Sequence, residues 1–152
     1  MDVDNLILFQ RERDKSILKT QHLEGQSLLT KKILAFQVSI GELAAETNCY
    51  NFWSESKKTD KDLILTKYIK SLRSLVSIGV EKNFSELTIE DKELDLEVTE
   101  QFLNLFIDTN DLIVCSSKDN YITLLEDFFC LGRSLGLDDN IIKRNYIGQY
   151  SN

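Results

Sequence analysis

Residues 33–46 read ILAFQVSIGELAAE, and this stretch decides the fold that the sequence predicts. Wound as an α-helix, it is apolar around most of its circumference, which is the pattern of a helix buried inside a protein. Glu42 interrupts the apolar surface, and a buried carboxylate needs a cation, a metal ion or hydrogen-bond donors close by. We therefore expect a central, mostly buried helix over residues 27–48 and a specific polar partner for Glu42.

A second long helix is predicted over residues 59–78. Thr59 with Asp62 suits a helix start, and Gly79 suits a helix end. One face of this helix is apolar and is made of Leu65, Tyr68, Ile69, Leu72, Leu75 and Val76. A continuous apolar face of this kind indicates that the helix packs against a neighbour.

Lys67 and Lys70 lie three residues apart on the second helix, so they point to the same side of it. Three interpretations are open. The lysines form a salt bridge with Glu42 across the helix interface, they lie on a solvated polar face, or, together with Arg73, they hold a phosphate group. The first interpretation gives Glu42 the counter-charge that it requires.

Further helices are expected over residues 3–20, 98–115, 118–135 and 138–146, while the acidic segment 81–97 predicts a loop, with a short helix or a strand pair as alternatives. The chain has 152 residues without a repeat or a linker, which indicates a single domain. It contains no proline, a residue that is frequent in the loops of all-β proteins. The predicted fold class is all-α, a bundle of four or five main helices.

Composition excludes several classes of function. A formal net charge of −7 argues against nucleic-acid binding by general electrostatics and against an anionic membrane surface. No apolar run approaches the ~20 residues that span a bilayer, and the N-terminus lacks the basic region of a signal peptide, so we expect a cytoplasmic protein. Cys49, Cys115 and Cys130 form no CxxC pair and His22 is the only histidine, which predicts reduced thiols and no zinc site.

Several stretches together carry a family resemblance. They are residues 22–26 (HLEGQ), 31–46, 46–54 (ETNCYNFWS), 128–132 (FFCLG) and 135–137 (LGL). These stretches resemble the dimeric, all-α dUTPases, which belong to the wider all-α nucleoside triphosphate pyrophosphatase group that includes the MazG-like enzymes. The resemblance covers most of the chain, more weakly over residues 81–115. It implies a helical bundle and a homodimer.

The resemblance also implies a chemistry, the magnesium-dependent hydrolysis of dUTP to dUMP and diphosphate. Family members hold the metal with two pairs of acids, each pair three residues apart, on facing helices. Aligned on this chain, the first pair falls on Ser39 and Glu42 and the second on Lys67 and Lys70. Only Glu42 retains an acid, although Glu46 matches a further family acid in a supporting position.

The nucleotide pocket departs from the family pattern as well. Where the family has His-Phe for uracil recognition and stacking, this chain has Arg73-Ser74. The family's nucleotide-contacting tail is expected to be missing or cut short at the end of the sequence. The resemblance implies ligand contacts at Gln21, His22, Glu46, Trp53, Lys67, Lys70 and Arg73. The structural alternative for His22 is a local hydrogen-bonding role. The structural alternative for Trp53 and its aromatic neighbours is packing in the core or at an interface.

From these departures we expect dUTP diphosphatase activity to be lost, with no catalytic residue and no metal at the vestigial site of Ser39, Glu42, Lys67 and Lys70. The protein would then act by binding, and the ligand is either a protein, as when a phage or mobile-element protein reuses a host-type fold, or an anionic small molecule. The alternative is a divergent magnesium-dependent pyrophosphatase whose metals are held by Glu42, Glu46 and acids of the region 90–100.

Overall fold

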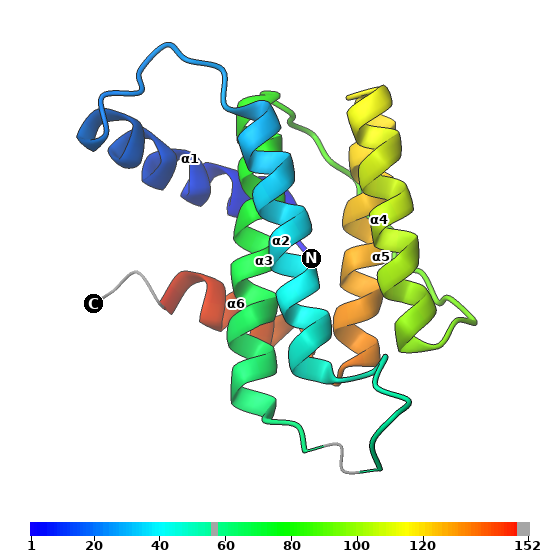
Figure 1. Cartoon of the computed structure of the whole chain (residues 1–152). Helices are drawn as coiled ribbons and strands as arrows, with labels where there is room; N and C mark the ends of the chain where they lie inside the picture. Colours follow the sequence, from blue (N-terminus) through cyan, green and yellow to red (C-terminus); the bar gives the residue numbers. More distant parts are fainter. Residues whose placement is uncertain (56–57, 149–152) are drawn as a thin grey trace.

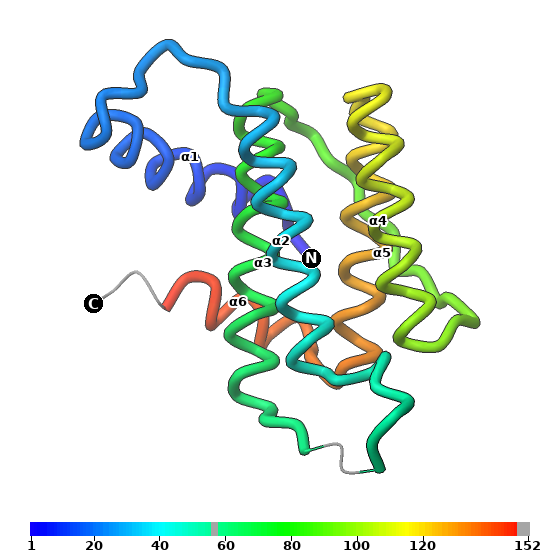
Figure 2. Tube along the Cα trace, viewed as in Figure 1, coloured from blue at the N-terminus to red at the C-terminus, as the bar shows by residue number. Residues whose placement is uncertain are grey.

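The computed structural model describes residues 1–55 and 58–148 (Figures 1 and 2). Its helices are α1 (Val3–Thr20), α2 (Leu29–Thr47), α3 (Lys61–Glu81), α4 (Val98–Val114), α5 (Lys118–Ser134) and α6 (Asp139–Gly148). The described residues form no strand, so the predicted all-α fold class is confirmed. None of the helices among them combines the length and the apolar character that crossing a bilayer requires.

Two antiparallel helix pairs form the body of the molecule. Figure 1 shows α2 beside α3 and α4 beside α5, with α1 and α6 lying across α3. The core between the pairs is built from large, fully buried side chains, among them Phe36, Ile40, Leu72, Leu105 and Phe128. Because α1 packs on α3 near the start of α2, these three helices enclose the cleft described below.

Two helix ends follow the local chemistry of the sequence, and one predicted end does not. Asp60 precedes α3, and its carboxylate accepts a hydrogen bond from the backbone N–H of Asp62. Gly136 follows α5 with a φ of +79°, the left-handed conformation that favours glycine. The predicted helix end at Gly79 is wrong, because this glycine lies inside α3, which continues to Glu81.

Gly79 on α3 and Gly132 on α5 each face a tyrosine ring of the other helix. The ring of Tyr68 on α3 lies over Gly132 on α5, and the ring of Tyr121 on α5 lies over Gly79 on α3. Both phenol hydroxyls donate to backbone carbonyls, Tyr68 to Phe128 at 3.1 Å and Tyr121 to Leu75 at 2.8 Å. A Cβ atom on either glycine would lie 2.5 Å from the facing hydroxyl oxygen. The two Tyr–Gly contacts therefore fix the distance between the helix pairs.

One face of α2 is less buried than its sequence predicts. Phe36, Ile40 and Leu43 are fully buried, as expected for the central helix. Leu34 and Val38, however, are 60% and 52% exposed. The prediction of a helix buried around most of its circumference is therefore wrong on this face, where an apolar surface remains open in the single chain.

The acidic segment 82–97 forms neither the short helix nor the strand pair left open by the sequence. It is an irregular strap along α5, held by buried carboxylates. The ammonium group of Lys92 lies 3.0 Å from Glu126 Oε2 and 3.2 Å from Asp127 Oδ1, and the backbone N–H of Glu90 donates to Glu126. Arg133 donates to the backbone carbonyl of Lys92 at 2.8 Å. Charged residues that look scattered in the sequence thus form specific contacts that hold this segment against α5.

Candidate functional site

Glu42 meets both lysines across the interface of α2 and α3. Lys70 Nζ lies 2.8 Å and Lys67 Nζ 3.4 Å from the same oxygen, Glu42 Oε2. This confirms the predicted salt bridge. The hydrogen bond from Lys70, with the positive charges of Lys70 and Lys67, lowers the pKa of Glu42. All three side chains are only partly buried. The two ion pairs therefore lie at the surface, between α2 and α3, and not within the core.

Ser39, the remaining aligned position, forms its hydrogen bond within its own helix and not with the ion pair. Ser39 is buried, and its hydroxyl donates to the carbonyl of Ala35 one turn earlier on the same helix at 2.8 Å. Glu46, one turn beyond Glu42, makes no hydrogen bond or ion pair with any described residue. Residues 1–55 and 58–148 contain no group of three or more His, Cys, Asp or Glu side chains that could hold a metal ion. The acids that the divergent-enzyme alternative needs are thus not gathered there.

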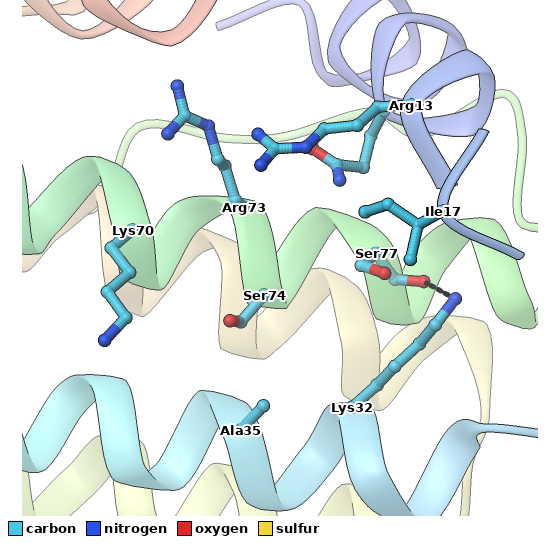
Figure 3. Close-up of a pocket in the computed structure, with 9 residues that line it drawn as sticks. Arg13, Ile17, Lys32, Ala35, Lys70, Arg73, Ser74 and Ser77 are labelled. Atoms are coloured by element: carbon cyan, nitrogen blue, oxygen red, sulfur yellow. Dashed lines mark hydrogen bonds between the residues drawn. The ribbon is translucent and has the colours of Figure 1, made fainter. Parts of the chain in front are cut away.

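A cleft of ≈ 270 Å³ opens beside this ion pair, between α1, α2 and α3 (Figure 3). Its walls are Gln10, Arg13, Ile17, Lys32, Ala35, Lys70, Arg73, Ser74 and Ser77. These residues include four cationic side chains and no carboxylate. Figure 3 shows Arg13 reaching from α1 toward Arg73, and Lys70 and Ser74 pointing into the gap between α3 and α2. We call this region the cationic cleft.

A buried polar network forms one end of the cationic cleft. Lys32 Nζ lies 3.3 Å from Asp14 Oδ2 and 3.3 Å from Glu81 Oε2. The Ser77 hydroxyl donates to Asp14 at 2.7 Å, and the Gln10 amide donates to the other oxygen of Asp14 at 2.9 Å. Because these residues come from α1, α2 and α3, the network fixes α1 over the cleft.

Arg73 forms the opposite wall. Its guanidinium donates to the carbonyl oxygen of Tyr146 at 3.3 Å and lies 5.6 Å from the centroid of the Tyr146 ring, within cation–π range. Tyr146 belongs to α6, and its hydroxyl donates to Gln10 at 2.6 Å. The side chain of Arg73 is thereby held in place before any ligand arrives.

A second hollow of ≈ 420 Å³ adjoins the first. It is lined by Lys31, Leu34, Ala35, Val38, Ser39, Lys70 and Ser74. The two hollows share Ala35, Lys70 and Ser74, so Lys70 and Ser74 lie at their junction. The first hollow is cationic, whereas Leu34 and Val38 give the second an apolar wall.

The structure does not bring all predicted ligand residues together. Lys67, Lys70 and Arg73 lie at or beside the cationic cleft. Gln21 and His22 are exposed in the loop before α2, whereas Trp53 lies in the loop after it. The 19 residues of α2 separate these loops by about 28 Å (Figure 2). One ligand of small size cannot contact both groups in a single chain.

The aromatic residues after α2 do not join the core. Phe52 and Trp53 are 90% and 66% exposed, and their rings meet edge to face at a centroid distance of 5.1 Å. The alternative of core packing for these residues is therefore wrong, and an interface or ligand role remains a prediction. Sequence reasoning also missed Arg13, because nothing in the local pattern of α1 indicates that this helix lies across α3.

Comparison with known proteins gives one finding and two absences. A protein-family model described as dUTPase matches residues 2–151. No curated protein and no solved structure gives a significant match.

Proposed function

This chain belongs to the all-α dUTPase family, and from that premise we propose that it is a member that has lost dUTP hydrolysis and acts by binding an anionic ligand. One observation carries the proposal. Lys67 and Lys70 contact Glu42 at the place where the family resemblance puts the magnesium cage. The lysines thus take the place of the metal as the counter-charge of the one surviving acid.

Electrostatics supports the loss of magnesium. Four acids in the cage positions would carry a formal charge of −4, whereas Ser39, Glu42, Lys67 and Lys70 carry +1. A divalent cation next to two ammonium groups is repelled by several kcal/mol even at an effective dielectric constant of about 20. Magnesium also needs carboxylate or phosphate oxygens to replace its tightly held waters, and Glu42 alone offers them here. No water would then be activated for attack on a phosphoryl group.

Restoring the cage tests this proposal. We expect the variant Ser39→Glu/Lys67→Glu/Lys70→Asp to bind Mg²⁺ measurably in titration calorimetry, while the natural chain does not. A matched control, Ser85→Glu/Lys61→Glu/Lys143→Glu, makes the same change in net charge at exposed sites. We expect no measurable Mg²⁺ binding by this control. Because Ser39 is buried, the double variant Lys67→Glu/Lys70→Asp serves as a second test, and circular dichroism checks the fold of each protein.

Two results would contradict the proposal. Magnesium-dependent release of diphosphate or phosphate by the natural chain, from dUTP, dUDP or any other nucleotide of a panel, would establish the divergent-enzyme alternative. A folded triple variant that binds no Mg²⁺ would show that the cage lay elsewhere.

We also propose that the protein is a homodimer whose interface covers the open apolar face of α4. Leu103, Ile107 and Val114 on α4 are 61%, 60% and 80% exposed, and Ile113 of the same helix shares a hollow with Leu34 of α2. A contiguous apolar surface of this kind is typical of a protein–protein interface.

Light scattering in solution is expected to give twice the chain mass of 17.6 kDa. Leu103→Glu/Ile107→Glu should give the monomer mass, since two carboxylates cannot be buried against an apolar partner. Thr123→Glu/Glu100→Gln, on exposed positions of α5 and α4, serves as the control. A natural chain that stays monomeric at high concentration would contradict the homodimer.

A further inference from the structure

We propose that the cationic cleft binds the phosphate group of a small phosphorylated organic molecule directly, through Arg13, Lys70, Arg73 and Ser74, and without a metal ion. The inference rests on the proposed function, because it names the ligand of a binding protein. The two proposals can be tested separately, because phosphate binding without a metal ion can be measured whether or not the protein hydrolyses dUTP.

The cations converge from two helices on one cavity. Lys70, Arg73, Ser74 and Ser77 follow each other at spacings of three and four residues, so they form one face of α3. Arg13 extends from α1 to the same cavity and is directed toward Arg73 (Figure 3). A ligand in the cleft therefore meets positive charge from opposite walls.

The chemistry of these side chains suits phosphate. Guanidinium groups present a planar fork of N–H donors that matches two phosphate oxygens, and an ammonium group adds a compact charge. Arg73 is already held by Tyr146, so little side-chain freedom is lost when a ligand binds. The Ser74 hydroxyl makes no hydrogen bond with any described residue and can donate to the ligand.

The region around the cationic cleft is positively charged, whereas the whole chain is negatively charged. The chain has a net charge of −7, yet Arg13, Lys32, Lys67, Lys70 and Arg73 gather at or beside this cleft. Lys32 is balanced by Asp14 and Glu81, whereas the single carboxylate of Glu42 is shared by two lysines. One positive charge of that lysine pair exceeds the charge of Glu42. A concave, locally positive region on an acidic protein concentrates small anions.

The second hollow indicates what is attached to the phosphate. It shares Lys70 and Ser74 with the cationic cleft, and Leu34 and Val38 line it. A phosphate held at the junction would direct its ester substituent along this apolar wall. The ligand class is therefore a phosphate ester with an apolar or planar substituent, and inorganic diphosphate should bind less tightly than such an ester.

The test uses phenyl phosphate and inorganic diphosphate with the natural full chain in EDTA, measured by titration calorimetry. We expect phenyl phosphate to bind more tightly than diphosphate, with affinity falling as salt is raised. Arg13→Gln and Lys70→Gln should each weaken phenyl phosphate at least tenfold. Lys15→Gln on α1 and Lys61→Gln on α3, at exposed positions away from the cleft, should leave affinity unchanged.

A measurement on the natural chain alone removes the dependence on variant folding. Titration with phenyl phosphate, followed by amide chemical shifts, should move the signals of residues 70–74 and leave those of α5 in place. No binding of either probe at millimolar concentration, binding that requires Mg²⁺, or affinity unaffected by both cleft variants would overturn the inference. If the protein neither hydrolyses nucleotides nor binds phosphate, this inference is wrong, but the proposed loss of hydrolysis is still supported.

Discussion

Replacing Gly132 with alanine is expected to lower the free energy of unfolding by about 3 kcal/mol. The added Cβ atom would lie 2.5 Å from the Tyr68 hydroxyl oxygen and 2.7 Å from Cζ of the same ring. The ring cannot move aside easily, because it is fully buried and stacked on Phe128 at a centroid distance of 4.5 Å. The helices must separate or the Tyr68–Phe128 hydrogen bond must break, and either change costs packing throughout a dense core.

Urea unfolding followed by circular dichroism measures the effect, and Gly41→Ala is the matched control. Gly41 also lies inside a helix, but a Cβ atom there meets nothing within 4 Å. The control should gain about 0.5–1 kcal/mol, because alanine favours helix over glycine. Adding Tyr68→Phe to Gly132→Ala should recover part of the loss, since the nearest clash is removed and the Cζ contact remains. A Gly132→Ala protein as stable as the Gly41→Ala protein would contradict this packing.

The general fold could be predicted because its causes are local. Helical periodicity and the absence of proline predict an all-α bundle, with helices close to their observed positions. Gly79 shows where local reasoning fails. A glycine near the end of a periodic stretch is typical of a helix stop, but here it is needed because Tyr121, 42 residues later in the chain, covers it. Such a partner is visible only in three dimensions.

The candidate site divides in the same way. The contact of Glu42 with Lys67 and Lys70 followed from spacing on two helices that were expected to face each other. The contribution of Arg13 to the cationic cleft could not be predicted in this way. Arg13 belongs to a helix whose crossing of α3 is set by the buried network around Lys32. The open face of α2 was mistaken for core, since an apolar surface looks alike in sequence whether it faces the protein interior or another chain.

A different buried group makes stability depend on pH. Asp108 on α4 is 8% exposed and lies beside Asp127 on α5, with one carboxyl oxygen lacking any hydrogen-bond partner among the described residues. Burial, then the hydrogen bond and the charge of Asp127, with a smaller contribution from Asp111, raise the pKa of Asp108 to about 7, although Lys92 opposes them. Asp127 itself remains held by Lys92 and Asn104. The Asp108 carboxyl thus keeps its proton at mildly acidic pH.

The sign of the effect follows from the two states. In the unfolded chain the Asp108 carboxyl has its ordinary pKa of 3.8, so between pH 4 and about 7 the folded protein holds a proton that the unfolded chain has lost. Unfolding then releases a proton, and the free energy of unfolding falls as pH rises through this range. Above about pH 7 the second charge beside Asp127 is present, and the loss is complete.

Asp108→Asn is therefore expected to raise the free energy of unfolding by about 2 kcal/mol at pH 8 and to change it little at pH 5. The asparagine amide stays neutral at both pH values and can donate to Asp127 as the protonated acid does. Urea unfolding at the two pH values measures the difference, with Asp95→Asn, an exposed acid of the strap, as the control. If the variant loses as much stability from pH 5 to pH 8 as the natural chain does, the loss belongs to groups other than Asp108.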